Sequence, residues 1–311
     1  MQPSPLSADL SSNLGVRHWQ ALAFVTFSAG LSWPIMKIGV TALPPLTFRC
    51  ITLLLALPCV AVIALLQGVS LRLPRSVWKK VGTLTVTNML LFHVMLILAL
   101  PWLTSGRAAI LAYTMPIFSA LWGWKYFGDR LTWAQWLGVA AAGAAIVLMI
   151  WHEIGHISTV PVASLAVMAG AAIWALGTQQ MRRAQLNLPS LTLAFWMLLL
   201  TGLVIGLLAF CFERARWHFP SMTGIWVLLY TGFVVIGLGS AVQFYLVRTL
   251  APIASSTGVM MIPVIGITGG AVWLGEPLYW QDYTAVSLIV VAIAIVVLGD
   301  RRSAVKQQHK R

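Results

Sequence analysis

The stretch Ser190–Cys211 reads SLTLAFWMLLLTGLVIGLLAFC and carries no charged side chain. A helix needs about 20 apolar residues to cross the hydrocarbon core of a bilayer, so this stretch predicts a transmembrane helix. The whole chain of 311 residues has the same character, with 59% hydrophobic and only 9% charged residues. Soluble domains carry about 25% charged residues because their surface faces water. The sequence therefore indicates that a bilayer surrounds the protein, and it leaves no room for a soluble catalytic domain.

Ten apolar segments of this kind are separated by clusters of turn-forming and charged residues. They are residues 19–39, 46–67, 77–99, 105–126, 132–150, 162–181, 190–211, 223–247, 253–274 and 281–299. The sequence therefore predicts an all-α integral membrane protein with ten transmembrane helices. Cys50, Cys59 and Cys211 fall inside or beside these segments, so we expect no disulfide.

The 20 lysine and arginine residues are distributed unevenly between the connecting segments. With a cytoplasmic N-terminus, most of them fall on the cytoplasmic side, and the opposite loops hold only Arg214 and Arg216. Basic loops stay in the cytoplasm, so we expect both termini there, in a multi-pass protein of the inner membrane. The net charge of +13 then serves to orient the chain, and we expect no nucleic-acid partner.

The two halves of the chain repeat one another. At one constant offset Pro116 aligns with Pro263, Gly128 with Gly275 and Asp129 with Glu276. Five helices is an odd number, so the second half enters the membrane upside down, and inverted repeats of this kind enclose a central cavity. We expect a cytoplasmic tail at 1–18, a first repeat at 19–151, a periplasmic linker at 152–161, a second repeat at 162–299 and a basic cytoplasmic tail at 300–311.

Several stretches together resemble the EamA type of the drug/metabolite transporter superfamily. They are Gly30 to Gly39 with Lys37, Arg49, Thr104–Leu111, Pro116, the Gly128–Leu131 hairpin with Gln135 and Gly138, Pro263, and Gly275–Leu278. The resemblance covers nearly the whole chain. It implies a secondary transporter, often an exporter, of amino acids, nucleobases, sugars or other metabolites, and it names no single substrate.

All seven acidic residues lie outside the predicted spans or at their ends. This argues against ion coupling through an intramembrane carboxylate. It leaves coupling through a histidine or through backbone groups, exchange, or facilitated diffusion. His93 is the only histidine inside a span, and Asn88 lies five residues before it. Polar groups at membrane depth face a cavity or a partner helix, so both residues are candidates either for the substrate pathway or for helix packing.

Aromatic residues at intermediate depth are the second group of candidates. Trp33 and Trp174 are related by the repeat, as are Tyr113 and Met260. These four residues either line the pathway or simply pack. Pro34, Pro116 and Pro263 are expected to kink helices near the same depth. A third set, Gln179, Gln243 and Tyr245, lies nearer the cytoplasmic side and is a candidate inner gate.

Three cations lie within spans toward the outer face: Lys37, which is also a candidate for the substrate pathway, Arg49 and Arg107. They either extend toward lipid phosphates or form a positive outer rim that attracts a carboxylate or a phosphate. The second interpretation predicts an anionic or zwitterionic metabolite, such as an amino-acid-like solute.

One motif offers a different function. His152-Glu153-Ile154-Gly155-His156 fits the H-E-x-x-H pattern of zinc proteases. The sequence lacks a downstream third ligand within a span, so we interpret this segment as a polar loop and expect neither a metal nor a cofactor. A membrane metalloenzyme and a non-transporting accessory protein remain the alternatives to a transporter.

Overall fold

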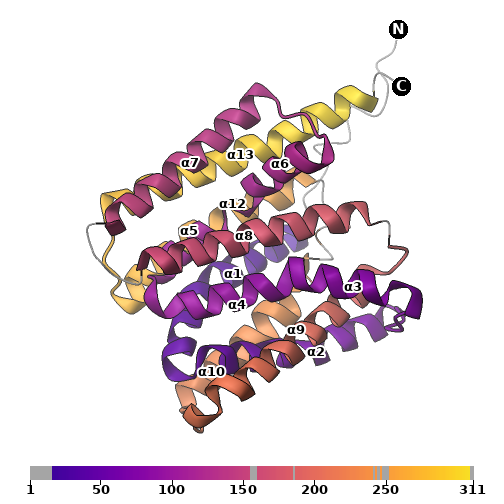
Figure 1. The fold of residues 1–311 in the computed structure, drawn as a ribbon, viewed down its shortest axis with the longest axis vertical. Helices are drawn as coiled ribbons and strands as arrows, with labels where there is room; N and C mark the ends of the chain where they lie inside the picture. The colour runs from indigo at the N-terminus through magenta and orange to yellow at the C-terminus, as the bar shows by residue number, and fades with distance from the viewer. Residues whose placement is uncertain are drawn as a thin grey trace.

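Helices are the only regular secondary structure in the residues that the structure describes (Figure 1). This computed structural model describes residues 16–154, 160–184, 186–240, 242–243, 246 and 252–308. The long helices are α1 (Val16–Ala42), α2 (Pro45–Leu66), α7 (Trp133–Ile154), α8 (Val160–Arg183), α9 (Ser190–Glu213), α12 (Pro252–Leu274) and α13 (Trp280–Gln308). The prediction of an all-helical chain is confirmed for these ranges.

The remaining elements are shorter pieces that continue one another. They are η2 (Arg75–Val77), α3 (Trp78–Thr85), η3 (Val86–Leu90), α4 (Leu91–Ala99), η4 (Leu100–Trp102), α5 (Ser105–Ala112), α6 (Met115–Phe127), η5 (Arg214–Arg216), α10 (Met222–Leu229) and η6 (Tyr230–Leu238). The segments η3 and η6 are π-helical. Such widened turns are uncommon and often mark functional sites in helices.

Five helical stretches are long and apolar enough to cross a membrane within the described part of the chain. They are Arg17–Ala42, Pro45–Leu66, Arg75–Trp102, Val160–Arg183 and Ser190–Arg216. Shorter apolar helices accompany them at Trp133–Met149, Met222–Leu238, Met260–Leu274 and Trp280–Ile295. This pattern is that of a multi-pass membrane protein.

Pro116 explains why one predicted span is broken. The helix that begins at Ser105 stops at Ala112, and a new helix starts at Met115 with Pro116 in its first turn. Proline has no N–H and its ring collides with the preceding turn, so it fits a helix start but not a helix interior. Pro34 and Pro263 lie inside α1 and α12 instead.

Two hairpins are built alike. Gly128 and Gly275 adopt positive φ angles of 74° and 63°, a conformation that suits glycine at a helix C-terminus. The amide of Asp129 then donates to the Gly123 carbonyl at 3.0 Å, and that of Glu276 donates to the Gly270 carbonyl at 3.3 Å. Each hairpin thus turns back into the next helix, α7 or α13.

The next helices also begin in the same way. The Thr132 amide donates to Oε1 of Gln135 at 2.8 Å, and the Tyr279 amide donates to Oδ2 of Asp282 at 2.9 Å. In both cases a side chain three residues ahead satisfies a free amide at the helix start, as in a capping box.

The helices pack as pairs that are remote in sequence. In Figure 1, α7 lies beside α13, α2 beside α9 and α4 beside α8, and the same pairs are in extensive contact. Close approaches use glycine. A side chain at Gly177 of α8 would come within 2.6 Å of the Asn88 backbone, and one at Gly106 of α5 within 2.6 Å of Ile267. Small residues at such points let helix backbones approach in a membrane.

The connecting segments gather at two opposite ends of the bundle. We call the end that contains residues 42–47, 100–105, 213–221 and 275–282 the Glu276 end, since hydrogen bonds described below join these segments. The opposite end, which contains residues 128–132 and Arg183, is the Asp129 end. The core between them is continuous and apolar.

We predict that Gly177→Ala destabilises the bundle, because the added methyl group would overlap the backbone of η3. Overpacking of this kind costs about 1–3 kcal/mol. The matched control is Gly143→Ala on α7, where nothing lies within 4 Å of the added methyl. Thermal unfolding of the purified protein in detergent should show a lower midpoint for the first variant only. Equal midpoints would contradict the close α8–η3 contact.

Candidate functional site

An aromatic pair forms the centre of the candidate site. Trp33 on α1 is only 6% exposed, and its ring meets that of Tyr113 edge-on, with centroids 6.4 Å apart. Tyr113 lies at the break between α5 and α6, which Pro116 creates. Gly266 of α12 faces the Trp33 ring. Three helices therefore meet around one indole.

Arg49 of α2 lies on the same side of α1 as this pair. Its Nη2 is 3.3 Å from the sulfur of Met36, and Met36 follows Trp33 by three residues, hence on the same helical face. Arg49 is 3% exposed, and its Nε has no hydrogen-bond partner in the structure. A buried charge without a partner is costly.

His93 is the next polar group in this interior. It lies on α4, half-buried, with its ring 5.7 Å from that of Phe92. Its Nδ1 is buried and has no hydrogen-bond partner among the described residues, and α4 packs against α2, the helix that carries Arg49. The sequence singled out His93 and Arg49 separately, and the structure places them on two helices that pack together.

Asn88 and Trp174 form a second group, between η3 and α8. With its amide oxygen turned toward α8, Asn88 accepts from the Trp174 indole N–H at 3.2 Å and from the Thr178 hydroxyl at 2.9 Å. The Trp174 ring also contacts that of Phe92, with centroids 4.4 Å apart and the ring planes tilted by 45°. These contacts tie the first half of the chain to the second through neutral hydrogen bonds.

Lys37 is held by backbone carbonyls. Its Nζ donates to the oxygens of Leu100, Pro101 and Leu103 at 2.8, 2.8 and 2.7 Å. An ammonium group has three donors, and all three are used here. Lys37 thus closes the C-terminal end of the α4–η4 helix.

Arg107 is held by a carboxylate. Its Nε donates to Oδ1 of Asp282 at 3.0 Å, and its guanidinium lies 5.8 Å from the centre of the Tyr279 ring. Arg107 and Asp282 are both buried. The pair fastens the start of α5 to the start of α13.

Two glutamates cap helix starts at the Glu276 end. Glu213 accepts from the amides of Leu46 and Thr47 at 3.0 and 2.8 Å. Glu276 accepts from the Ser105 amide at 2.8 Å and from its hydroxyl at 2.7 Å. Anions at helix N-termini accept hydrogen bonds from the free amides and interact favourably with the positive end of the helix dipole. The repeat in the sequence aligned Glu276 with Asp129, whereas no sequence pattern singled out Glu213.

The described residues of the candidate inner gate, Gln179 and Gln243, lie in different environments. Gln179 is buried and donates to the Ser119 carbonyl at 2.7 Å, and it also contacts Arg183, which pairs with Asp129 at 2.7 Å. Gln243 is exposed, and Tyr245 lies outside the described residues. Met260 packs against the core from α12.

The H-E-x-x-H segment is described only in part. The helix α7 reaches Ile154, whereas Gly155 and His156 lie outside the described residues. The predicted polar loop and the alternative metal site therefore both stay predictions.

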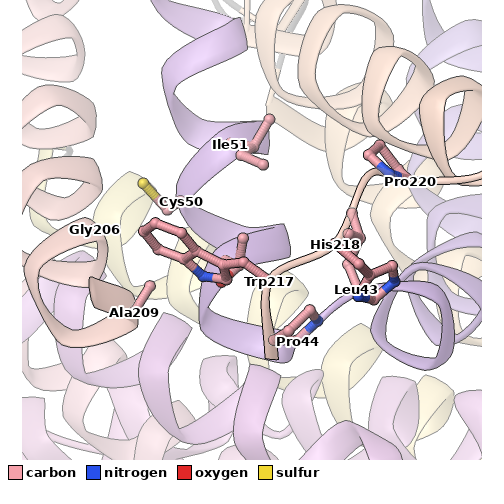
Figure 2. Close-up of a pocket in the computed structure, with 10 residues that line it drawn as sticks. Leu43, Pro44, Cys50, Ile51, Gly206, Ala209, Trp217, His218 and Pro220 are labelled. Atoms are coloured by element: carbon pink, nitrogen blue, oxygen red, sulfur yellow. The ribbon is translucent and has the colours of Figure 1, made fainter. Parts of the chain in front are cut away.

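Each end of the bundle has a surface cavity lined by described residues. One of about 370 Å³ lies at the Glu276 end between α2, α9 and the 217–220 loop. Figure 2 shows the Trp217 ring reaching toward Cys50 and Ala209; its indole N–H donates to the Thr47 hydroxyl at 2.8 Å. The other, of about 460 Å³, lies at the Asp129 end and is lined by Lys79, Lys80, Arg183 and four uncharged residues. The first cavity is apolar and the second is basic.

Apolar helices that enclose buried charged and aromatic side chains are typical of membrane transporters. The profile of the EamA-like transporter family matches residues 19–151 and again residues 162–298. The chain therefore belongs to the EamA-like transporter family, as the resemblance in sequence indicated. It is a transporter of the drug/metabolite transporter superfamily.

Relatives agree in class. The chain is 28% identical over 282 residues to the "Uncharacterized transporter YvbV" of Bacillus subtilis, covering 88% of this chain and 90% of that one. It is 24% identical to a "Probable amino-acid metabolite efflux pump" of Salmonella typhimurium, covering 88% and 92%. A solved structure titled "Crystal structure of protein" has the same fold, with a TM-score of 0.64 at 21% identity over 90% of this chain and 98% of that one.

We predict that Lys37→Met lowers stability by at least about 1.5–3 kcal/mol, the contribution of one hydrogen bond to a charged group. The cause is the loss of a donor for three carbonyls. Thermal unfolding in detergent measures the effect, and Lys79→Met, an exposed lysine of α3, is the control. If Lys37→Met instead left stability unchanged and altered only the preference for charged solutes, the structural role of Lys37 would be wrong.

Proposed function

We propose that this transporter is a secondary exporter of a small metabolite that works by alternating access. Its ten transmembrane helices form two inverted five-helix halves around a central site, with both termini in the cytoplasm. The Glu276 end then faces outward and the Asp129 end faces the cytoplasm. The name of the Salmonella relative, an efflux pump, is consistent with export.

Related contacts recur in the two halves and support the inverted repeat. The hairpins at Gly128 and Gly275 have equivalent hydrogen bonds. The π-helical segments η3 and η6 both lie in the third helix of their half. The packing is also reciprocal, because α1 contacts α12 while α8 contacts α6. A pseudo-two-fold axis in the membrane plane relates transporter halves in this way.

The closure of the Glu276 end is the observation that carries the mechanism. Glu276 of the second half caps α5 of the first half, and Gly106 of α5 packs directly on Ile267 of α12. An outward release path requires these contacts to open. The central residues Trp33, Asn88, His93, Tyr113, Trp174 and Met260 then form the pathway beneath them.

We predict that the purified protein in liposomes carries solute at a rate above that of protein-free liposomes. A panel of radiolabelled amino acids, carboxylates, nucleobases and sugars tests this. Unlabelled solute on the opposite side should accelerate the flux, because a carrier that returns loaded exchanges faster. The absence of flux for every compound in the panel, with correctly folded protein, would contradict the transport function.

We predict that Glu276→Ala opens the outward end more often. The loss of its charge-assisted hydrogen bonds, each worth about 1.5–3 kcal/mol, shifts the equilibrium about tenfold or more. In a background without native cysteines, a cysteine at buried Ala109, which lies beneath the cap and against Gly266, reports the opening. It should react faster with a membrane-impermeant thiol reagent added outside.

The control for this measurement is Glu213→Ala. Glu213 also caps a helix start with its carboxylate, but it caps α2 rather than α5. It should leave the reaction rate of the Ala109→Cys reporter unchanged. Equal acceleration by both variants would indicate general loosening and would count against a specific outward gate.

A further inference from the structure

We infer that Arg49 recognises a carboxylate of the transported solute and that this solute is a monoanion with an apolar or aromatic body. The inference rests on the proposed transport function and narrows its substrate class. It follows from a comparison of the polar partners that the protein provides for its buried cations.

Two of the three cations that lie toward the outer face of the predicted spans already have a strong polar partner within the protein. Lys37 donates to three carbonyls, and Arg107 pairs with Asp282. Arg49 differs from both. Its described polar contact is the sulfur of Met36, a weak acceptor, and its Nε has no partner.

None of the described carboxylates supplies a counter-charge to Arg49. Four of the seven have described side chains, and each is engaged elsewhere: Asp129 with Arg183, Glu213 with α2, Glu276 with Ser105 and Asp282 with Arg107. The other three, Asp9, Glu153 and Asp300, lie outside the predicted spans or at their ends. A guanidinium keeps its charge near neutral pH, so the missing anion has to come with the solute.

The geometry of arginine suits a carboxylate. Its planar fork binds both carboxylate oxygens at once, and the Nε edge that lacks a partner belongs to that fork. His93, whose Nδ1 is also buried without a partner among the described residues, adds a second polar group from α4, which packs against α2.

The surroundings of Arg49 fit an apolar body. Met36 contacts the guanidinium, Trp33 lies one turn away on the same face of α1, and Tyr113 lies edge-on to Trp33. None of the four described carboxylates is left to receive an ammonium group. A simple carboxylate is therefore favoured over a zwitterionic amino acid, which narrows the class that the sequence predicted.

Wild-type protein tests the inference without any substitution. We would measure binding of 3-phenylpropanoate, its carboxamide and phenylalanine to the purified protein in detergent. These ligands share a skeleton and differ in charge. The acid should bind about tenfold or more tightly than the other two. Equal or tighter binding of the amide would overturn the carboxylate site, and equal or tighter binding of phenylalanine would overturn the preference for a monoanion.

Variants then assign the effect to Arg49. Arg49→Gln should abolish the preference for the acid over the amide, and Arg49→Lys should keep only part of it, because an ammonium lacks the fork. Arg72→Gln removes the same charge from an exposed loop and should change nothing. A full preference retained in Arg49→Gln would overturn the inference. If that variant does not fold, Arg49→Lys and the wild-type comparison still decide.

Flux measurements separate this inference from the proposed function. If liposomes carry neutral solutes and show no preference for the acid, transport stands and the role of Arg49 is wrong. If the acid binds through Arg49 but no solute crosses the liposome membrane, the site stands and the transport mechanism is wrong.

Discussion

Unpaired backbone groups at helix ends are the constraint on which this bundle depends. Lipid offers no hydrogen bonds, so each N–H and C=O near the apolar layer needs a partner within the protein. Glu213, Glu276 and Lys37 supply those partners at the Glu276 end. Each of them joins segments that are far apart in sequence. The same side chains that satisfy helix ends therefore also determine which helices are neighbours at that end.

The interior follows a different rule. The links of α8 to η3 and to α6 are neutral, as in the bond of Asn88 of η3 to Trp174 and that of the Trp122 indole of α6 to the Ala172 carbonyl at 2.7 Å. Neutral hydrogen bonds contribute about 0.5–1.5 kcal/mol, and bonds to charged groups contribute more. The strongest polar contacts between the halves are thus at the ends. A transporter that rocks about its middle would have its barriers there, where opening breaks charge-assisted bonds and the centre only readjusts.

The sequence predicted the helical membrane fold and the family, because apolar length and hairpin chemistry are local properties. It also predicted that Gly128 and Gly275 end helices, because few residues other than glycine readily adopt a positive φ angle. The partners of the charges could not be read in the same way. No sequence pattern around Lys37 indicates that its ammonium group binds the backbone carbonyls that begin at Leu100. Likewise, Asp282 lies 175 residues from its partner Arg107. Such pairings depend on how the helices pack, which no local pattern records.

The three span cations illustrate what decides function in a membrane interior. By sequence they are equivalent, each a single positive charge in an apolar helix. By structure they differ in whether the protein provides the opposing polarity: three carbonyls for Lys37, a buried carboxylate for Arg107 and a thioether for Arg49. A cation that the fold already pairs is stabilised little further by a bound solute. A buried cation without a strong partner is stabilised more, because the solute offsets its loss of hydration. We therefore infer that the binding residue is Arg49, the cation to which the described residues offer the weakest partner, and that the aromatic pair beside it limits which anion can fit.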